Sequence, residues 1–121
     1  CDLSENPGFE GFLGQVRNDL IGDKAVAAIE YTAYPEMADL TFHEIREAAF
    51  AAYPLTCLHI YHSLGTVLAG EISLFVFTSA IHRAEAIKAC EYIVERIKHE
   101  APVWGKEILE DGSSVWKVNT L

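Results

Sequence analysis

The chain has 121 residues, of which half are hydrophobic, so it is long enough to bury one sizeable core. Its formal net charge of −9 excludes broad electrostatic attraction to nucleic acid or to an anionic membrane surface. No apolar run approaches the roughly 20 residues that a membrane-spanning helix needs. We therefore expect a soluble, single-domain protein over residues 1–121, with no nucleic-acid or membrane partner.

The first half of the chain predicts two strands and a helix. Residues 9–16, FEGFLGQV, alternate apolar with small or polar side chains, as a strand does. The polar segment 17–24 predicts a loop, and residues 25–34 predict a second strand. Pro35 suits the first turn of a helix, and apolar residues recur at helical spacing from there to Tyr53.

The next segments predict two strands and a long helix. Residues 56–65 have an alternating strand pattern, in which His62 and the nearby His59 are interpreted as strand-surface residues rather than metal ligands. A glycine-flanked connection then leads to the apolar run 71–80, which is typical of a strand buried on both faces. Residues 84–98 carry a single apolar stripe, which predicts a helix that faces the sheet.

Pro102 ends that helix, because proline lacks the backbone donor that a helix interior requires. The remaining segment predicts two strands joined by a hairpin turn at Asp111-Gly112. The order of the elements indicates an α+β fold with a mostly antiparallel or mixed sheet. No glycine-rich phosphate loop is present, which disfavours a nucleotide-binding fold.

The cysteines indicate the redox environment. Cys1, Cys57 and Cys90 are odd in number and form no C-x-x-C pair, which argues against a disulfide framework and against a zinc site. A reducing cytoplasm fits this pattern best, and the polar start of the chain does not resemble a signal peptide. No metal is therefore expected.

Several basic or aromatic residues lie where predicted elements end, and such positions are where folds place functional groups. Together they would suit one anion site if they converge. Each also has an ordinary interpretation, as a solvated turn residue, a helix cap, a core aromatic or a strand-edge charge. The residues are Arg17, His82, Arg83, Lys98, Trp104 and Lys106.

Catalysis by hydrolysis is disfavoured, since no paired carboxylates, nucleophilic serine motif or electropositive cysteine setting is found. What remains is chemistry in which arginine and lysine bind an anion and a lysine acts as nucleophile or proton carrier.

Three segments, GQVRND, IEYTAYPEMA and SAIHRAEAIKACEYIVERIKHEAPVWGKE, together with a later tryptophan strand, resemble the large, catalytic subunits of molybdopterin synthase. The likeness extends from about Gly11 to Trp116. It implies a two-layer α+β fold of the hammerhead type and a homodimer within a heterotetramer. It also implies a partner, a small ubiquitin-like sulfur carrier with a C-terminal Gly-Gly. That terminus, as a thiocarboxylate, donates sulfur to cyclic pyranopterin monophosphate and forms the molybdopterin dithiolene.

The resemblance also implies residue roles. Lys98 matches the principal catalytic lysine, and Arg17, His82 and Arg83 match basic residues around the substrate's phosphate and pterin. Arginine's planar fork suits phosphate oxygens, which is consistent with binding roles. Trp104 is inferred to form part of the channel for the carrier's tail. Because the thiocarboxylate is the nucleophile, neither a catalytic cysteine nor a cofactor is expected.

Two positions depart from the family pattern. Gly105 replaces the first lysine after the tryptophan, so Lys106 would have to take over from the opposite face of a strand. Ser63 stands where an arginine is common. Two alternatives therefore remain open: a family member that binds the carrier or dimerises with weak or no synthase activity, and a ligand-sensing α+β domain unrelated to sulfur transfer.

Overall fold

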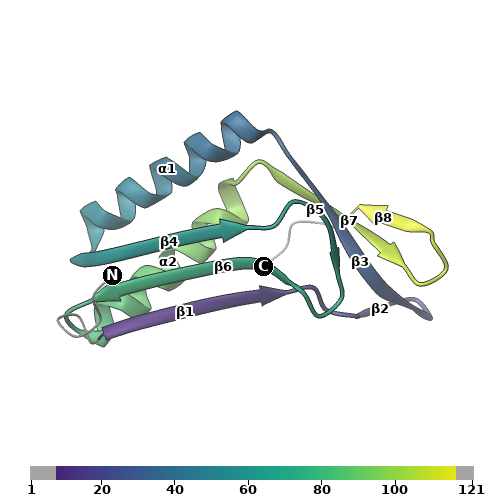
Figure 1. Ribbon diagram of the computed structural model, residues 1–121, viewed down its shortest axis with the longest axis horizontal. Helices are drawn as coiled ribbons and strands as arrows, with labels where there is room; N and C mark the ends of the chain where they lie inside the picture. Colours follow the sequence, from purple (N-terminus) through teal and green to yellow (C-terminus); the bar gives the residue numbers. More distant parts are fainter. Residues whose placement is uncertain (1–7, 117–121) are drawn as a thin grey trace.

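The computed structural model describes residues 8–116, and Figure 1 shows a strand-and-helix layer pair with a second sheet at one end. A three-stranded sheet has α2 packed on one face, and α1 lies against α2 and the edge strand β4. In spatial order the sheet contains β1 (Gly8–Gln15), β6 (Ile72–Ala80) and β4 (Leu55–His62). The helices are α1 (Pro35–Ala52) and α2 (Arg83–Glu100).

The second sheet is built around the long strand β3 and lies at the right of Figure 1. Its strands are β2 (Leu20–Ile21), β3 (Lys24–Ala33), β7 (Val103–Leu109) and β8 (Ser114–Trp116), with β5 (Gly65–Leu68) also paired to β3. Every strand pair within residues 8–116 is antiparallel. This confirms the predicted α+β class and the antiparallel alternative for its sheets.

Helix α2 buries the apolar stripe expected from its sequence, including Cys90, Ile93 and Ile97. The helix runs to Glu100, two residues beyond its predicted end, so Lys98 lies within the last turn. Pro102 follows directly after the cap residue Ala101. The chain then turns into β7 and enters the second sheet.

The molecule has two separate hydrophobic cores. The larger core lies between the three-stranded sheet and the helices and includes Ile45, Leu58, Val76 and Ile93. The smaller core belongs to the second sheet and is centred on Val16, Val26, Ile29, Val67 and Leu109. The turn after β1 and the start of β7 connect the three-stranded sheet and its helices to the second sheet. The junction between the two cores is therefore formed by the ends of strands and helices.

Two short strands were not predicted. β2 lies within the segment 17–24, expected to be a loop, and β5 lies within the glycine-flanked connection 65–70. Both have few residues and gain their hydrogen bonds from β3. β3 follows β2 after a two-residue turn, whereas it is distant in sequence from β5. Gly65 and Gly70 have positive φ angles of 75° and 91°, which let the chain turn before and after β5.

The expectation of no disulfide is wrong at Cys57, which is disulfide-bonded. Its partner lies outside the described residues. Cys90 is a free, buried thiol, and burial raises its pKa to about 11. Among the described residues, no helix is long and apolar enough to cross a membrane, and no group of three or more His, Cys, Asp or Glu side chains could hold a metal ion.

Candidate active site

A cavity of about 510 Å³ lies where the two parts of the molecule meet. The ends of β1, β4 and α2 contribute to its wall, together with the beginnings of β6 and β7 and Tyr31 near the end of β3. Its lining residues are Phe12, Gly14, Gln15, Arg17, Tyr31, His62, Ser73, Leu74, Ile97, Lys98, Ala101, Val103, Trp104 and Gly105. Three residues predicted from the sequence, Arg17, Lys98 and Trp104, are therefore brought together.

Among residues 8–116, the lining of this cavity carries two cations, Arg17 and Lys98, and no carboxylate. The whole chain, in contrast, has 18 Asp and Glu residues against nine Lys and Arg. A positively charged recess in an acidic protein suits an anionic ligand. The net charge of the described lining is therefore positive, whereas the net charge of the whole chain is negative.

Lys98 is placed by the last turn of α2. Its neighbour Ile97 is buried in the larger core, which fixes the orientation of this turn. The ammonium Nζ of Lys98 lies 5.5 Å from the centroid of the Phe12 ring on β1, within cation–π range. The aromatic face thus holds a positive charge at the wall of the cavity.

Arg17 follows β1 and is more exposed than Lys98. The backbone on either side of it is fixed, because Val16 donates to Glu71 O at 3.0 Å and Val16 O accepts from Gly70 N at 2.7 Å. Its guanidinium forms an ion pair with Asp19 at 3.2 Å, and both side chains are largely exposed. Such an exposed pair is weak, so an anionic ligand can compete for the guanidinium.

Trp104 lies at the rim of the cavity near the start of β7. Its side chain is 45% exposed, and its ring meets Tyr34 edge-to-face with centroids 5.1 Å apart. Tyr34 caps the beginning of α1, so the aromatic pair joins the two segments at the rim. The arrangement leaves a large, partly exposed apolar surface next to the cavity.

Gly105 also lines the cavity, but the space beside it is largely filled. A Cβ atom at this position would lie 3.0 Å from Ile29 Cγ2 and 3.4 Å from Tyr31 Cε1. The Tyr31 ring therefore packs against the bare backbone of Gly105. The Tyr31 ring therefore occupies the part of the cavity wall where a side chain at position 105 would lie.

Lys106 lies outside this lining. Strand alternation directs it away from Gly105, and its Nζ lies 5.6 Å from the centroid of the Trp116 ring. Across the sheet Lys106 is the partner of Glu30 on β3. Its contacts are those of a residue on the opposite face of the second sheet.

His82 and Arg83 lie at the other end of the molecule from the cavity. His82 caps the beginning of α2 and Arg83 is its first residue. Arg83 and Lys98 lie about 22 Å apart along the axis, given a rise of about 1.5 Å per residue. A single copy of the chain therefore does not bring the His82–Arg83 pair to the cavity.

His62 was interpreted as a strand-surface residue, but the structure places it in the cavity wall, half-buried. Its Nδ1 lies 2.7 Å from Ser63 O, and its ring meets Tyr31 edge-on with centroids 5.0 Å apart. Burial lowers the pKa of His62 and raises that of Tyr31. The signal was present in the sequence, since alternation puts His62 on the same face as Leu58 and Ile60.

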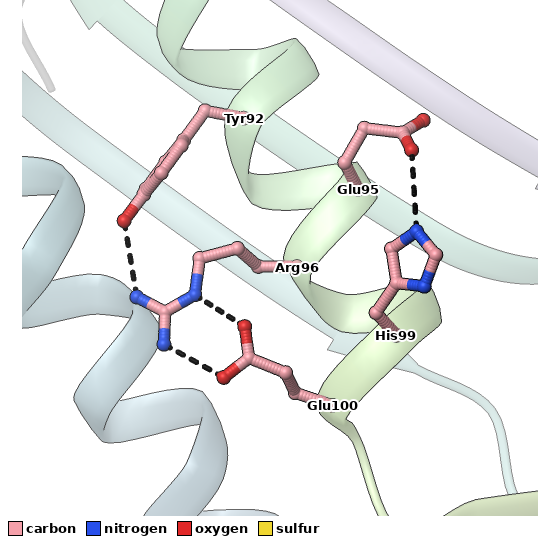
Figure 2. Close-up of polar contacts among 5 residues, drawn as sticks. All are labelled: Tyr92, Glu95, Arg96, His99 and Glu100. Atoms are coloured by element: carbon pink, nitrogen blue, oxygen red, sulfur yellow. Dashed lines mark hydrogen bonds and ion pairs between the residues drawn. The ribbon is translucent and has the colours of Figure 1, made fainter.

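Figure 2 shows the polar contacts that brace the last turns of α2. Arg96 donates to both carboxylate oxygens of Glu100, at 2.6 and 2.8 Å, and to the hydroxyl of Tyr92 at 3.0 Å. His99 lies 3.9 Å from Glu95. The Arg96 guanidinium holds the pKa of Glu100 below its usual range. These pairs stabilise the helix end that carries Lys98.

Comparison with known proteins agrees with this architecture. The profile of the family described as "MoaE protein" matches residues 5–100. A protein of Oryza sativa subsp. indica named molybdopterin synthase catalytic subunit is 44% identical over 108 residues, which are 89% of this chain and 55% of that protein. The chain thus spans about half the length of this curated relative.

Solved structures share the fold. The crystal structure of molybdopterin synthase from Staphylococcus aureus superposes with a TM-score of 0.87 at 33% identity, covering 94% of this chain and 82% of that one. A chain in the complex of subunits 1 and 2 of molybdopterin-converting factor from Helicobacter pylori 26695 superposes with a TM-score of 0.78 at 23% identity, covering 93% and 73%.

Proposed function

Because this chain belongs to the MoaE family, we propose that it acts as the catalytic subunit of a molybdopterin synthase. In this role it transfers sulfur from a thiocarboxylated carrier subunit to cyclic pyranopterin monophosphate and thereby forms the molybdopterin dithiolene. The observation that carries the proposal is the cavity whose described lining holds Arg17 and Lys98 and no carboxylate. The cysteines no longer support the cytoplasm as the location, because Cys57 is disulfide-bonded.

The two cations divide the work by their chemistry. Arg17 binds the phosphate of the precursor, since a guanidinium fork matches phosphate oxygens and its present partner Asp19 is a weak, exposed competitor. Lys98, held over Phe12 in the cavity wall, moves protons or stabilises the charge that develops as sulfur adds. No metal or cofactor takes part in this proposal.

The carrier approaches from the side of Trp104. A C-terminal Gly-Gly tail is thin and extended, and the exposed faces of Trp104 and Tyr34 offer it an apolar wall at the cavity rim. The small-subunit complex known for the Helicobacter pylori relative supports a partner of this kind. The tail then ends beside Lys98.

A second copy of the chain covers the outer face of the three-stranded sheet. Phe9, Leu13 and Tyr61 on this face are 51%, 58% and 62% exposed, and Phe75 and Phe77 lie between them on the central strand. None of the outward positions of β1, β4 and β6 carries Asp, Glu, Lys or Arg. In a two-fold dimer the same surface of each copy contacts its equivalent, so charged side chains on it would face like charges. An acidic protein therefore self-associates best through an uncharged face.

This dimer bears on the remaining predicted residues. His82 and Arg83 are too far from the cavity to bind substrate within one copy, so a substrate-binding role for them requires the second copy. Lys106 is directed away from the cavity, so we assign proton transfer to Lys98. A catalytic role of Lys106 is tested separately.

Turnover by purified components tests the proposal. The chain, thiocarboxylated carrier and cyclic pyranopterin monophosphate are mixed, and molybdopterin is measured. We expect product from the unaltered chain and none above background from Lys98→Ala. Lys88→Ala, which alters an exposed lysine on the same helix, is the matched control and should retain full activity. Lys106→Ala shows whether that residue contributes.

A second candidate is a family member that binds the carrier but has weak or no synthase activity. Gly105 favours this candidate, because it removes a lysine that is usual in the family. Retained carrier binding without product from the unaltered chain would establish it. Absence of both carrier binding and product would leave a ligand-sensing role unrelated to sulfur transfer.

A further inference from the structure

His62 is a polar residue of the cavity that the roles above leave without a function. It ends β4, lines the same cavity as Lys98 and Arg17, and packs edge-on against Tyr31. The remaining titratable side chains of the lining are Arg17, Tyr31 and Lys98. Because the described part of the lining holds no carboxylate that could accept a proton, His62 is the neutral base among these residues.

The hydrogen bonds fix which ring nitrogen of His62 is protonated. A carbonyl oxygen only accepts, so Nδ1, 2.7 Å from Ser63 O, carries the proton. Ser63 is itself held in place, because its N and Oγ donate to Ser73 O and Ile72 O at 2.8 and 2.9 Å. The neutral ring therefore has its free lone pair on Nε2.

Nε2 of His62 is open to the cavity. It has no hydrogen-bond partner among residues 8–116, and it is not one of the buried side-chain atoms that lack a partner, so solvent reaches it. A nearby water can thus donate to Nε2. Burial lowers the pKa of this imidazole and outweighs the hydrogen bond to Ser63 O, which raises it, so the neutral ring is favoured at pH 7.

The proposed sulfur transfer needs an activated water. The nucleophilic sulfur of the carrier's –COS⁻ group bonds to an electrophilic carbon of the pterin precursor, and a carbon–oxygen bond at that carbon breaks with its electron pair on oxygen. The carrier is then joined to the precursor as a thioester. Release of the carrier as a carboxylate requires an oxygen atom, and water can supply it. Water is a poor nucleophile at neutral pH unless a base takes its proton.

Building on the proposed function, we propose that His62 is the general base that hydrolyses this thioester. Nε2 takes a proton from water as the water oxygen bonds to the carbonyl carbon of the terminal glycine. The carbon–sulfur bond then breaks with its electron pair on sulfur, which stays on the pterin as a thiolate. The carrier is released as a carboxylic acid, which gives its remaining water-derived proton to solvent and becomes a carboxylate. The proton on Nε2 also passes to solvent.

The substitution His62→Asn tests this step, because asparagine keeps a donor near the position of Nδ1 but cannot act as a base. We expect kcat to fall by about 10²-fold, the size typical of a lost general base, while KM changes little. The carrier–pterin thioester should accumulate and be detectable by mass spectrometry. His43→Asn, on the exposed face of α1, is the control and should behave as the unaltered chain.

Three further measurements separate a base from a structural residue. Turnover in H₂¹⁸O should place ¹⁸O in the carrier's terminal carboxylate. Added imidazole should restore release in a His62→Gly variant. The acid limb of the kcat profile, lying below pH 6.5 because burial lowers the pKa of His62, should disappear in His62→Asn.

The outcomes distinguish this inference from the proposed function. If the unaltered chain makes neither thioester nor product, the proposed function fails. If it makes product but His62→Asn keeps full kcat, or blocks thioester formation instead of its hydrolysis, the role of His62 is refuted. Should the variant fail to fold, ¹⁵N NMR of the unaltered chain decides: a proton on Nε2 at pH 7 contradicts the proposal.

Discussion

At the scale of single residues, glycines determine which larger groups can approach one another. Gly105 lets the Tyr31 ring pack against bare backbone, and that ring in turn supports His62. Gly8 plays a similar part at the other end of β1, where a Cβ atom would lie 2.5 Å from Arg83 N and His82 C. The start of β1 therefore touches the backbone at the beginning of α2.

The substitution Gly8→Ala tests this close approach. We expect a loss of about 1 to 3 kcal/mol in the free energy of unfolding, because the clashing atoms are backbone and cannot rotate away. Gly11→Ala in the same strand is the control, since its Cβ would meet nothing within 4 Å, and it should change stability by less than about 0.5 kcal/mol. Urea denaturation measures both, and equal effects would contradict the packing described.

Some residues of the cavity were predicted from the sequence and others were not. Arg17, Lys98 and Trp104 flank or end elements, so a reading based on element boundaries found them. His62 was not predicted for the cavity, because its spacing from His59 favoured a strand-surface residue, although alternation places it on the same face as Ile60. The predicted helix between Arg83 and Lys98 already separates these two residues by about 22 Å, because each residue adds about 1.5 Å along the axis. The expected convergence of the His82–Arg83 pair with Lys98 in one copy of the chain therefore conflicts with the predicted helix itself.

At the scale of elements, the β7–β8 hairpin is held by its turn and by a neighbouring strand. Asp111 accepts hydrogen bonds from the N and Oγ of Ser113 at 3.0 and 2.6 Å. Its carboxylate also pairs with Lys24, the first residue of β3. The Lys24 ammonium and the Ser113 donors hold the pKa of Asp111 well below its usual range, and the same ion pair raises the pKa of Lys24.

We expect Asp111→Asn to destabilise the protein more at pH 7 than at pH 3. The folded-state pKa of Asp111 is depressed, so its stabilisation is complete above the unfolded value of about 3.9. It declines as the pH falls from there toward the folded value. Urea midpoints at the two pH values give the comparison, with Asp23→Asn in the β2–β3 turn as control. A pH-independent difference would refute the assignment.

Elements with a strong local pattern were predicted and the weakly patterned ones were not. The stripe on α2 and the alternation in β4 are set by their own residues, so their existence was clear from the sequence. β2 and β5 exist only because β3 offers unpaired backbone groups on both sides of its length. Their short segments contain too few residues for a period to be recognised.

At the scale of the whole molecule, charge and apolar surface are separated. Acidic residues are plentiful on the exterior, whereas the outer face of the three-stranded sheet carries aromatic and aliphatic side chains without a formal charge. Phe9 stacks on Phe77 and Tyr61 on Phe75, with ring centroids 6.0 and 6.1 Å apart. A continuous face of this kind is the expected site of self-association.

We expect the protein to be a dimer in sedimentation experiments and Leu13→Glu to weaken the dimer by at least about tenfold, because the new charges face one another across the two-fold axis. Leu20→Glu, which alters a leucine of β2 that is 69% exposed against 58% for Leu13, is the control and should leave the dimer intact. An unaltered dimer in Leu13→Glu would exclude this face. A monomeric chain that loses carrier binding on the same substitution would assign the face to the carrier.

The contrast between the acidic exterior and the cationic described lining governs how ligands reach the cavity. Because salt screens charges over about 8 to 10 Å, an approaching anion meets the acidic exterior and the exposed Arg17 before it senses Lys98, which is less exposed. Bulky polyanions are held off at this distance, while a slender chain or a small phosphate ester can pass through the repulsive zone and be captured. The protein thus discriminates between ligands first by their size and shape, and only then by their charge.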